Sequence, residues 1–229
     1  MTRFSISTIL LAAAAVIAPV TAHAEVRITE FMYKGASDGN REFIELTNIG
    51  NAGIDITGWS YNDDNTNNPV TFGNAFGLLG ANESIILTEM TADAFRSYWN
   101  LDSSVRIFSI GGNSNLGNGD TINIYNSASQ SLATLVDSVT YPAGTTAGVS
   151  RNRPASLTGT ATNSQFVYSA TCDAFGSAYA SNAQSDLANP GRFATQTAAV
   201  PEPATWAMMI AGFGLIGLRA RRSRKVAFA

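Results

Sequence analysis

Three glutamates near the start of the chain, Glu30, Glu42 and Glu45, are the residues whose type and spacing could support a reaction. Two carboxyl groups flanking a glycosidic bond are enough for its hydrolysis. Glu45 lies between Ile44 and Leu46, so in a strand its side chain points away from their face. The default interpretation is a solvated carboxylate at a sheet edge or the partner of a nearby arginine. A hydrolase that acts on an extracellular polymer through paired carboxylates is kept as the alternative.

The sequence contains one histidine, His23, and one cysteine, Cys172. Histidine is the commonest general acid or base, the commonest transition-metal ligand and the usual activator of serine and cysteine nucleophiles. Because we expect His23 to be removed with a targeting segment, we predict that the mature chain is not an enzyme and uses no cofactor or metal. Cys172 has no second cysteine in the chain to pair with. We expect it to be a small buried hydrophobic residue, with a disulfide between molecules as the alternative.

One loop resembles a cation-binding pattern, because Asp63-Asp64-Asn65-Thr66-Asn67-Asn68 matches the first five positions of an EF-hand loop. The sixth position is Asn68 where the pattern requires glycine, and the twelfth is Asn74 where it requires glutamate. Aspartate and asparagine also favour turns for backbone reasons. The sequence leaves calcium binding by this loop open.

The amino-terminal segment has the three parts of a secretory signal. Arg3 supplies the positive start, an apolar run extends over residues 9–20, and Ala22 and Ala24 provide the small residues that a signal peptidase reads. The apolar run is too short for a membrane span of about 20 residues. We therefore predict that residues 1–24 form a signal peptide and that the mature chain starts at Glu25.

The carboxyl end combines a proline motif, an apolar stretch and a basic tail. Pro201, Glu202 and Pro203 come first, residues 204–218 are apolar, and the tail carries Arg219, Arg221, Arg222, Arg224 and Lys225. The apolar stretch spans about 22 Å as a helix, against a hydrocarbon core of about 30 Å. Basic residues stay on the cytoplasmic side of a bilayer. We therefore expect a helix that holds an exported chain in the membrane transiently.

These residues closely resemble the PEP-CTERM sorting signal of Gram-negative bacteria, in the variant with Trp-Ala-Met-Met after the prolines. The resemblance implies recognition by an exosortase that cuts near Pro201-Glu202-Pro203. The predicted processing partners are thus signal peptidase and exosortase, and the predicted location is the cell envelope or surface, or the extracellular matrix. A plain tail anchor is the alternative.

The body between the two ends is acidic. Residues 25–200 contain eight Arg and Lys residues against sixteen Asp and Glu residues, so the formal charge of this part is −8, although that of the whole chain is −3. Because phosphate backbones are bound by neutralising their charge, we predict that the protein binds no nucleic acid.

Short alternating segments separated by Gly and Asn turns predict an all-β sandwich for the body. One exception follows Thr91, a potential helix cap, where Phe95, Tyr98 and Trp99 have helical spacing. Trp59 is expected to pack between the sheets. The predicted strands are 26–33, 43–48, 54–61, 84–88, 105–110, 121–125 and 135–141.

The segments Ile28-Thr29-Glu30-Phe31 and Glu42-Phe43-Ile44-Glu45-Leu46-Thr47-Asn48 resemble the lamin-tail domain. Further landmarks of that family have counterparts in Asn118-Gly119-Asp120, in Val136-Asp137-Ser138-Val139-Thr140-Tyr141 and in Asn189-Pro190-Gly191. The match is weakest over residues 145–186. The resemblance implies an immunoglobulin-like sandwich with adhesion-like contacts and no common active site, so the fold does not by itself supply a function.

The predicted organisation is a signal peptide at 1–24, a lamin-tail-like β-sandwich at 25–193, a linker at 194–200 and the sorting signal at 201–229. We expect an exported, non-catalytic interaction or structural module with an extracellular polysaccharide or a surface protein as its partner. The sandwich should fold alone as a monomer.

Overall fold

The computed structural model describes residues 23–37, 39–64, 69–112, 115–181 and 183–193. The predicted signal peptide up to Ala22 and the predicted linker and sorting signal lie outside these residues. None of the described helices has the length and apolar character needed to cross a membrane.

The described strands are β1 (Val26–Met32), β2 (Phe43–Asn48), β3 (Ile54–Asp55), β4 (Ser60–Asn62), β5 (Val70–Thr71), β6 (Leu78–Leu79), β7 (Ser84–Thr88), β8 (Arg106–Ser109), β9 (Asp120–Tyr125), β10 (Leu135–Tyr141), β11 (Arg151–Asn152), β12 (Val167–Tyr168), β13 (Ala178–Ala180) and β14 (Ala183–Ala188). The helices are α1 (Ala92–Trp99) and the 3-10 turns η1 (Gly39–Arg41) and η2 (Asn163–Gln165).

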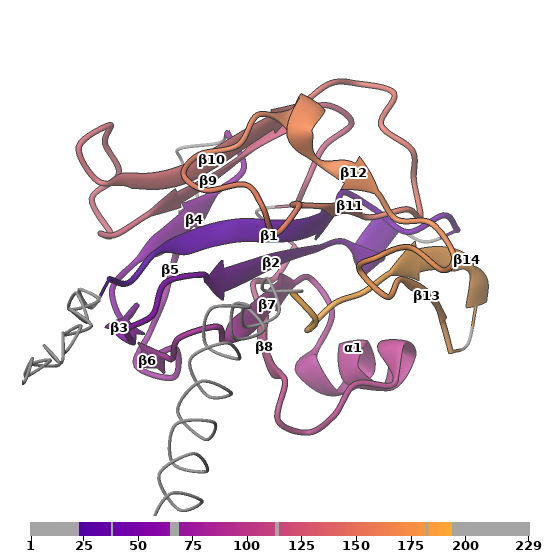
Figure 1. The fold of residues 1–229 in the computed structure, drawn as a ribbon, viewed down its shortest axis with the longest axis horizontal. Helices are drawn as coiled ribbons and strands as arrows, with labels where there is room; N and C mark the ends of the chain where they lie inside the picture. The colour runs from indigo at the N-terminus through magenta and orange to yellow at the C-terminus, as the bar shows by residue number, and fades with distance from the viewer. Residues whose placement is uncertain (1–22, 38, 65–68, 113–114, 182, 194–229) are drawn as a thin grey trace, which may run out of the picture.

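The predicted sandwich is confirmed. A six-stranded sheet with the order β12-β11-β1-β2-β7-β8 packs against a four-stranded sheet with the order β10-β9-β4-β5, and Figure 1 shows the two layers with α1 and the β13–β14 hairpin on the far side of the larger sheet. The main core lies between the sheets and includes Trp59, as predicted, with Phe31 and Tyr141 in ring contact at 5.3 Å. A second core lies on the opposite face of the larger sheet. That sheet is therefore covered on both sides, and every residue of β2 is buried.

A bulge in β1 determines which of its side chains face each core. β1 and β2 form an antiparallel hairpin, and their register shifts between Ile28 and Glu30. Ile28 and Phe31 both lie in the main core, and Met32 lies in the second. An extra residue in a strand shifts the alternation of all that follow it. The bulge thus places Glu30 opposite Glu45 of β2, on the face that carries the second core.

The predicted strand 54–61 is wrong as a single element. It divides into β3, which pairs with β6, and β4, which pairs with β5 and β9 in the smaller sheet. Gly58 between them has a φ of +80°, a conformation that side chains disfavour. At this turn the chain passes from the β3–β6 pair to the smaller sheet. The alternating pattern of the sequence does not reveal this change of partners.

The short helix is confirmed as α1. The Thr91 side chain accepts a hydrogen bond from the backbone N–H of Ala94, as expected for an N-cap, and Phe95, Tyr98 and Trp99 are its buried residues. Phe43 of β2 contacts the rings of both Phe95 and Trp99. The helix therefore covers the second core through its apolar face.

Candidate functional site

The three glutamates that could have formed a catalytic pair are all buried. Their exposed fractions are 1% for Glu30, 2% for Glu42 and 0% for Glu45. The default interpretation of Glu45 as a solvated edge carboxylate is wrong, because β2 is an interior strand between β1 and β7. Glu42 is the acceptor for the backbone N–H of Leu116 at 2.8 Å, and burial raises its pKa to about 9. None of these carboxyl groups is open to a substrate.

Glu30 and Glu45 together hold the last described segment of the chain. The Asn189 backbone N–H donates to Glu30 Oε1 at 2.9 Å, and the Gly191 N–H donates to Glu45 Oε2 at 2.6 Å. The other Glu45 oxygen accepts from the Thr29 hydroxyl at 2.7 Å. We call the Glu30 and Glu45 carboxyl groups and the backbone of residues 189–192 the C-terminal latch.

A buried network of hydroxyl and amide groups surrounds the Glu30 side of the latch. The Ser150 hydroxyl donates to Glu30 Oε1 and contacts the Ser169 hydroxyl at 2.6 Å. The Ser177 hydroxyl lies 2.9 Å from the Ser169 hydroxyl and 3.2 Å from Asn189 Oδ1. The network therefore joins β1 to the segments around residues 150, 169 and 177, a region for which no strand was predicted and where β11 to β13 lie.

Neither Glu30 nor Glu45 forms an ion pair with a described arginine or lysine. Hydrogen-bond donors and bound protons must therefore compensate the negative charge of these two carboxyl groups. Burial raises the pKa of Glu30 well above its ordinary value, and the neighbouring Glu45 raises it further. Burial also raises the pKa of Glu45, whereas hydrogen bonds from Thr29 and from the backbone of Gly191 act in the opposite direction. Burial thus favours the protonated form of both carboxyl groups.

The start of the described chain is tied to the same central strand. The backbone N–H of Glu25 donates to Asn48 Oδ1 at 3.1 Å, and its carbonyl accepts from the N–H of Ile49 at 2.7 Å. Asn48 also donates to the carbonyls of Leu79 and Gly80. A chain that starts at Glu25, after the predicted cleavage at Ala24, retains each of these groups. Cleavage itself stays a prediction.

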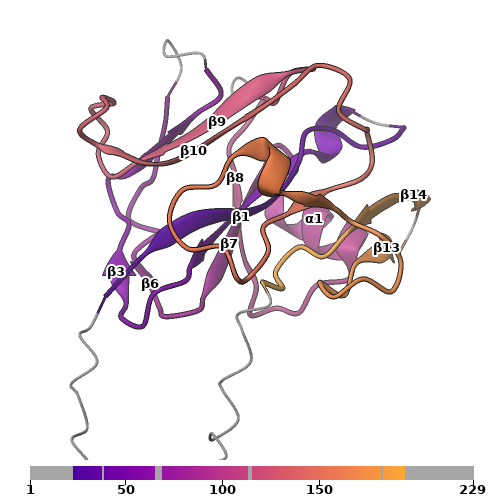
Figure 2. The same ribbon diagram turned by 45° about the horizontal axis from the view of Figure 1, so that its top comes forward.

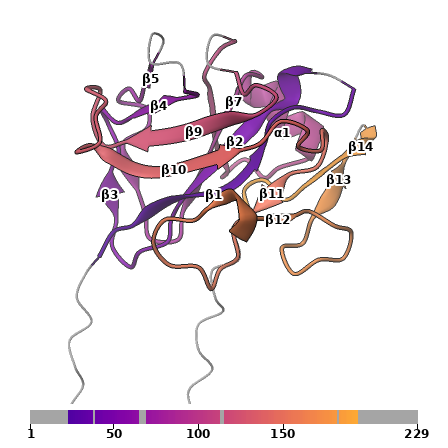
Figure 3. The same ribbon diagram turned by 90° about the horizontal axis from the view of Figure 1, so that it is seen from above.

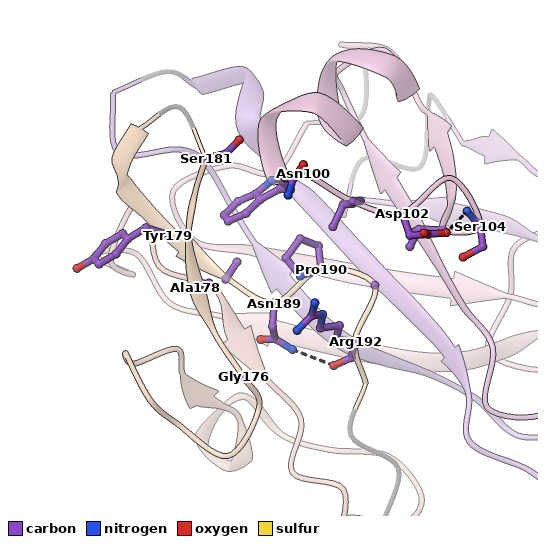
Figure 4. Close-up of a pocket in the computed structure, with 15 residues that line it drawn as sticks. Asn100, Asp102, Ser104, Gly176, Ala178, Tyr179, Ser181, Asn189, Pro190 and Arg192 are labelled. Atoms are coloured by element: carbon purple, nitrogen blue, oxygen red, sulfur yellow. Dashed lines mark hydrogen bonds between the residues drawn. The ribbon is translucent and has the colours of Figure 1, made fainter.

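A cleft of about 490 Å³ lies between the end of α1 and the latch. Figure 4 shows Asn100 and Asp102 on one side of it with Asn189, Pro190 and Arg192 on the other. Asp102 is the one carboxylate in its lining, and a hydrogen bond from the Ser104 backbone lowers the pKa of Asp102. Three smaller described clefts likewise contain one carboxylate each, Glu89 in one and Glu25 in two. A pair of carboxylates for acid and base catalysis is absent from all four.

Two further sequence predictions concern Cys172 and the loop 63–68. Cys172 is exposed, in a turn with a φ of +64°, so the prediction of a buried residue is wrong. Four of the six residues of the loop lie outside the described ones. Within the described part of the chain, no group of three or more His, Cys, Asp or Glu side chains is arranged to hold a metal ion.

The predicted sorting residues Pro201, Glu202 and Pro203, the basic residues Arg219 to Lys225 and the cleavage residue Ala22 lie outside the described part of the chain. The latch, in contrast, is a feature that sequence reasoning missed. Its only signal was the presence of Glu45 and Asn189-Pro190-Gly191 among the landmarks of one family, with no indication that they touch.

Comparison with known families agrees with this architecture. The family model of the PEP-CTERM protein-sorting motif matches residues 199–225. That motif implies export, processing by an exosortase and association with the surface or envelope of a bacterial cell. No curated protein matches the chain. The family model of the Lamin Tail Domain matches residues 19–143, more than half of the sequence, and this chain therefore belongs to the lamin-tail domain family.

Proposed function

We propose that the mature protein is a non-catalytic interaction module that its sorting signal delivers to the cell surface or to the extracellular polysaccharide matrix. The observation that carries the proposal is the sorting motif at 199–225, which comes after the sandwich in the sequence. The described domain ends at Phe193, so the seven residues of the predicted linker, 194–200, separate it from Pro201.

The arrangement of the two chain ends supports display of one end of the sandwich. Glu25 and Phe193 line the same small cavity of about 280 Å³, and Figures 2 and 3 show the start of β1 and the end of the described chain at one end of the molecule. The hairpin of β4 and β5 lies at the opposite end in Figure 3. A domain held through its carboxyl end thus presents the β4–β5 end to its surroundings.

The state of the carboxyl groups supports a non-catalytic role. The three candidate glutamates are buried, and the four described clefts contain single carboxylates. Glycoside hydrolysis requires two carboxyl groups about 5–9.5 Å apart on either side of the scissile bond. The hydrolase alternative therefore has no structural observation in its favour.

Sorting is tested by two variants that act through different physics. Replacing Arg221, Arg222 and Arg224 with Ala removes charges that cost about 2.5–3.5 kcal/mol each at the bilayer centre. That variant should slip through the membrane and appear as soluble, uncut protein. Pro201→Ala with Pro203→Ala removes the recognition motif, so the precursor should stay in the membrane fraction at full mass.

Fractionation and mass spectrometry distinguish the outcomes. The wild-type protein should be cut near residues 201–203 and retained at the surface or in the matrix. If the two variants behave alike, or if the wild type keeps its tail in the membrane, a simple tail anchor replaces the sorting proposal. Release of polymer fragments by the purified mature protein would overturn its non-catalytic role.

A further inference from the structure

We propose that the C-terminal latch is a proton-dependent clasp, in which a proton on the Glu30–Glu45 pair keeps residues 189–193 on the sheet and its loss frees them. The effect on the sorting segment described below rests on the proposed function. The opening of the clasp does not, because it follows from the contacts of the described residues.

At these positions, ionising both carboxyl groups at once is energetically unfavourable. They are direct cross-strand neighbours in the register of β1 and β2, and both are essentially inaccessible to solvent. Like charges directly opposite each other destabilise a sheet pair even at its surface. In the interior, two carboxylates that share a site keep a proton.

The surrounding groups do not replace that proton. Glu30 Oε2 has no hydrogen-bond partner among the described residues. Asp173, on the loop that packs beside Ser177, is a further negative charge that raises the pKa of Glu30. Arg192 contributes its backbone N–H to Glu45, and its side chain is exposed. Loss of the proton therefore leaves two negative charges, with a third nearby, facing only uncharged donors, namely backbone N–H groups and the hydroxyls of Thr29 and Ser150.

The segment 189–193 contacts both glutamates and contributes no residue to either core. It is held through the N–H groups of Asn189 and Gly191. The residues before it are fixed without the glutamates, because Ala188 lies in the second core, Leu187 pairs with Gly148 and Ser150, and Asp186 accepts from the Tyr98 hydroxyl. Among the described residues, the last member of the main core is Phe166. The sandwich can therefore stay folded while the clasp opens.

Opening lengthens the connection between the sandwich and the sorting motif. With the clasp closed, the tether to Pro201 begins after Phe193. Release of residues 189–193 adds five residues, or about 16 Å of extended chain at roughly 3.3 Å per residue. The clasp thus sets how far the folded domain stands from the site of processing.

Hydrogen exchange on the exported protein tests the clasp directly. Exchange of peptides covering residues 189–193 and of peptides from β2 is followed between pH 6 and pH 9 and corrected for the intrinsic dependence of exchange on pH. Since one proton leaves per opening, opening of 189–193 should rise by up to about tenfold per pH unit, while β2 stays protected. Trypsin cleavage after Arg192 should accelerate in parallel.

Two matched variants separate the clasp from general effects of buried acids. Glu30→Gln imitates the protonated carboxyl group, retains an acceptor for Asn189 and should keep the clasp closed over the whole range. Glu42→Gln removes another buried glutamate that does not touch the latch, and its segment 189–193 should open with pH as in the wild type.

Equal exchange of β2 and residues 189–193 would overturn the clasp, as would a pH dependence that persists in Glu30→Gln or disappears equally in both variants. Failure of sorting with an intact exchange result would instead overturn the proposed function and leave the clasp in place.

Discussion

Replacing Glu45 with alanine tests whether the carboxyl group that holds the chain end also stabilises the fold. The change removes the acceptor of the Gly191 N–H at 2.6 Å and of the Thr29 hydroxyl at 2.7 Å, and it leaves a gap in an interior strand. Thr29 has a second partner, the Thr47 hydroxyl at 2.7 Å, so the Gly191 N–H is the donor that is left without an acceptor.

The magnitude follows from these contacts. A buried donor without an acceptor costs about 1–3 kcal/mol, and the Arg192 N–H loses an acceptor at the same carboxyl group. Relief of the like charge next to Glu30 offsets part of this cost. We expect Glu45→Ala to lower the free energy of unfolding by about 2–4 kcal/mol, a large share of the roughly 5–15 kcal/mol typical of a domain.

Urea denaturation of the purified mature protein at pH 7 measures the effect. Glu45→Gln retains one acceptor oxygen and should cost about half as much. Asp93→Ala is the control, because Asp93 lies exposed in the first turn of α1 and its charge there is worth about 0.3–1 kcal/mol. If Glu45→Ala is no more destabilising than Asp93→Ala, the latch does not hold the fold and this reasoning is refuted.

Two further predictions concern Glu42 and Cys172. The pKa of Glu42 is raised to about 9 in the folded protein, so the folded state keeps a proton that the unfolded state releases above about pH 4.5, and stability should fall as pH rises through this window. Glu42→Gln should remove that loss. The difference in the free energy of unfolding between this variant and the wild type should therefore grow by on the order of 1 kcal/mol per pH unit, as measured by urea denaturation between pH 5 and pH 8. A difference that does not change with pH would contradict the assignment. Cys172 is exposed and should react with one equivalent of a thiol reagent without denaturant, and oxidised protein should form disulfide-linked dimers that Cys172→Ser abolishes; a thiol that reacts only after unfolding would contradict its exposure.

Local patterns in the sequence were sufficient for much of the fold. The alternation in residues 43–48 predicted β2, and Thr91 with the spacing of Phe95 and Trp99 predicted α1 and its cap. Both depend on contacts between residues that are close in the sequence. Residues 54–61 show the limit, because a positive φ at Gly58 sends β3 and β4 to different partners.

The latch could not be predicted because it depends on distant contacts and on a bulge. Gly191 and Glu45 are 146 residues apart in the sequence. Strict alternation from Ile28 would place Glu30 in the main core, and only the extra residue at the bulge moves it to the other face, opposite Glu45. Small polar residues such as Ser150, Ser169 and Ser177 carry no strand signal, although they surround Glu30.

Strand β2 gives the resemblance to lamin-tail domains a physical meaning. Its Glu45 binds the backbone of Gly191, and its Asn48 binds the backbone of Glu25. Both are buried side chains that satisfy main-chain groups near the first and the last residues of the domain, which an apolar residue cannot do. One interior strand therefore holds the residue that follows the predicted signal peptide and the segment that leads to the sorting motif. A polar pair three positions apart on a fully buried strand thus fixes the entry and the exit of the chain, which lie at the same end of the molecule.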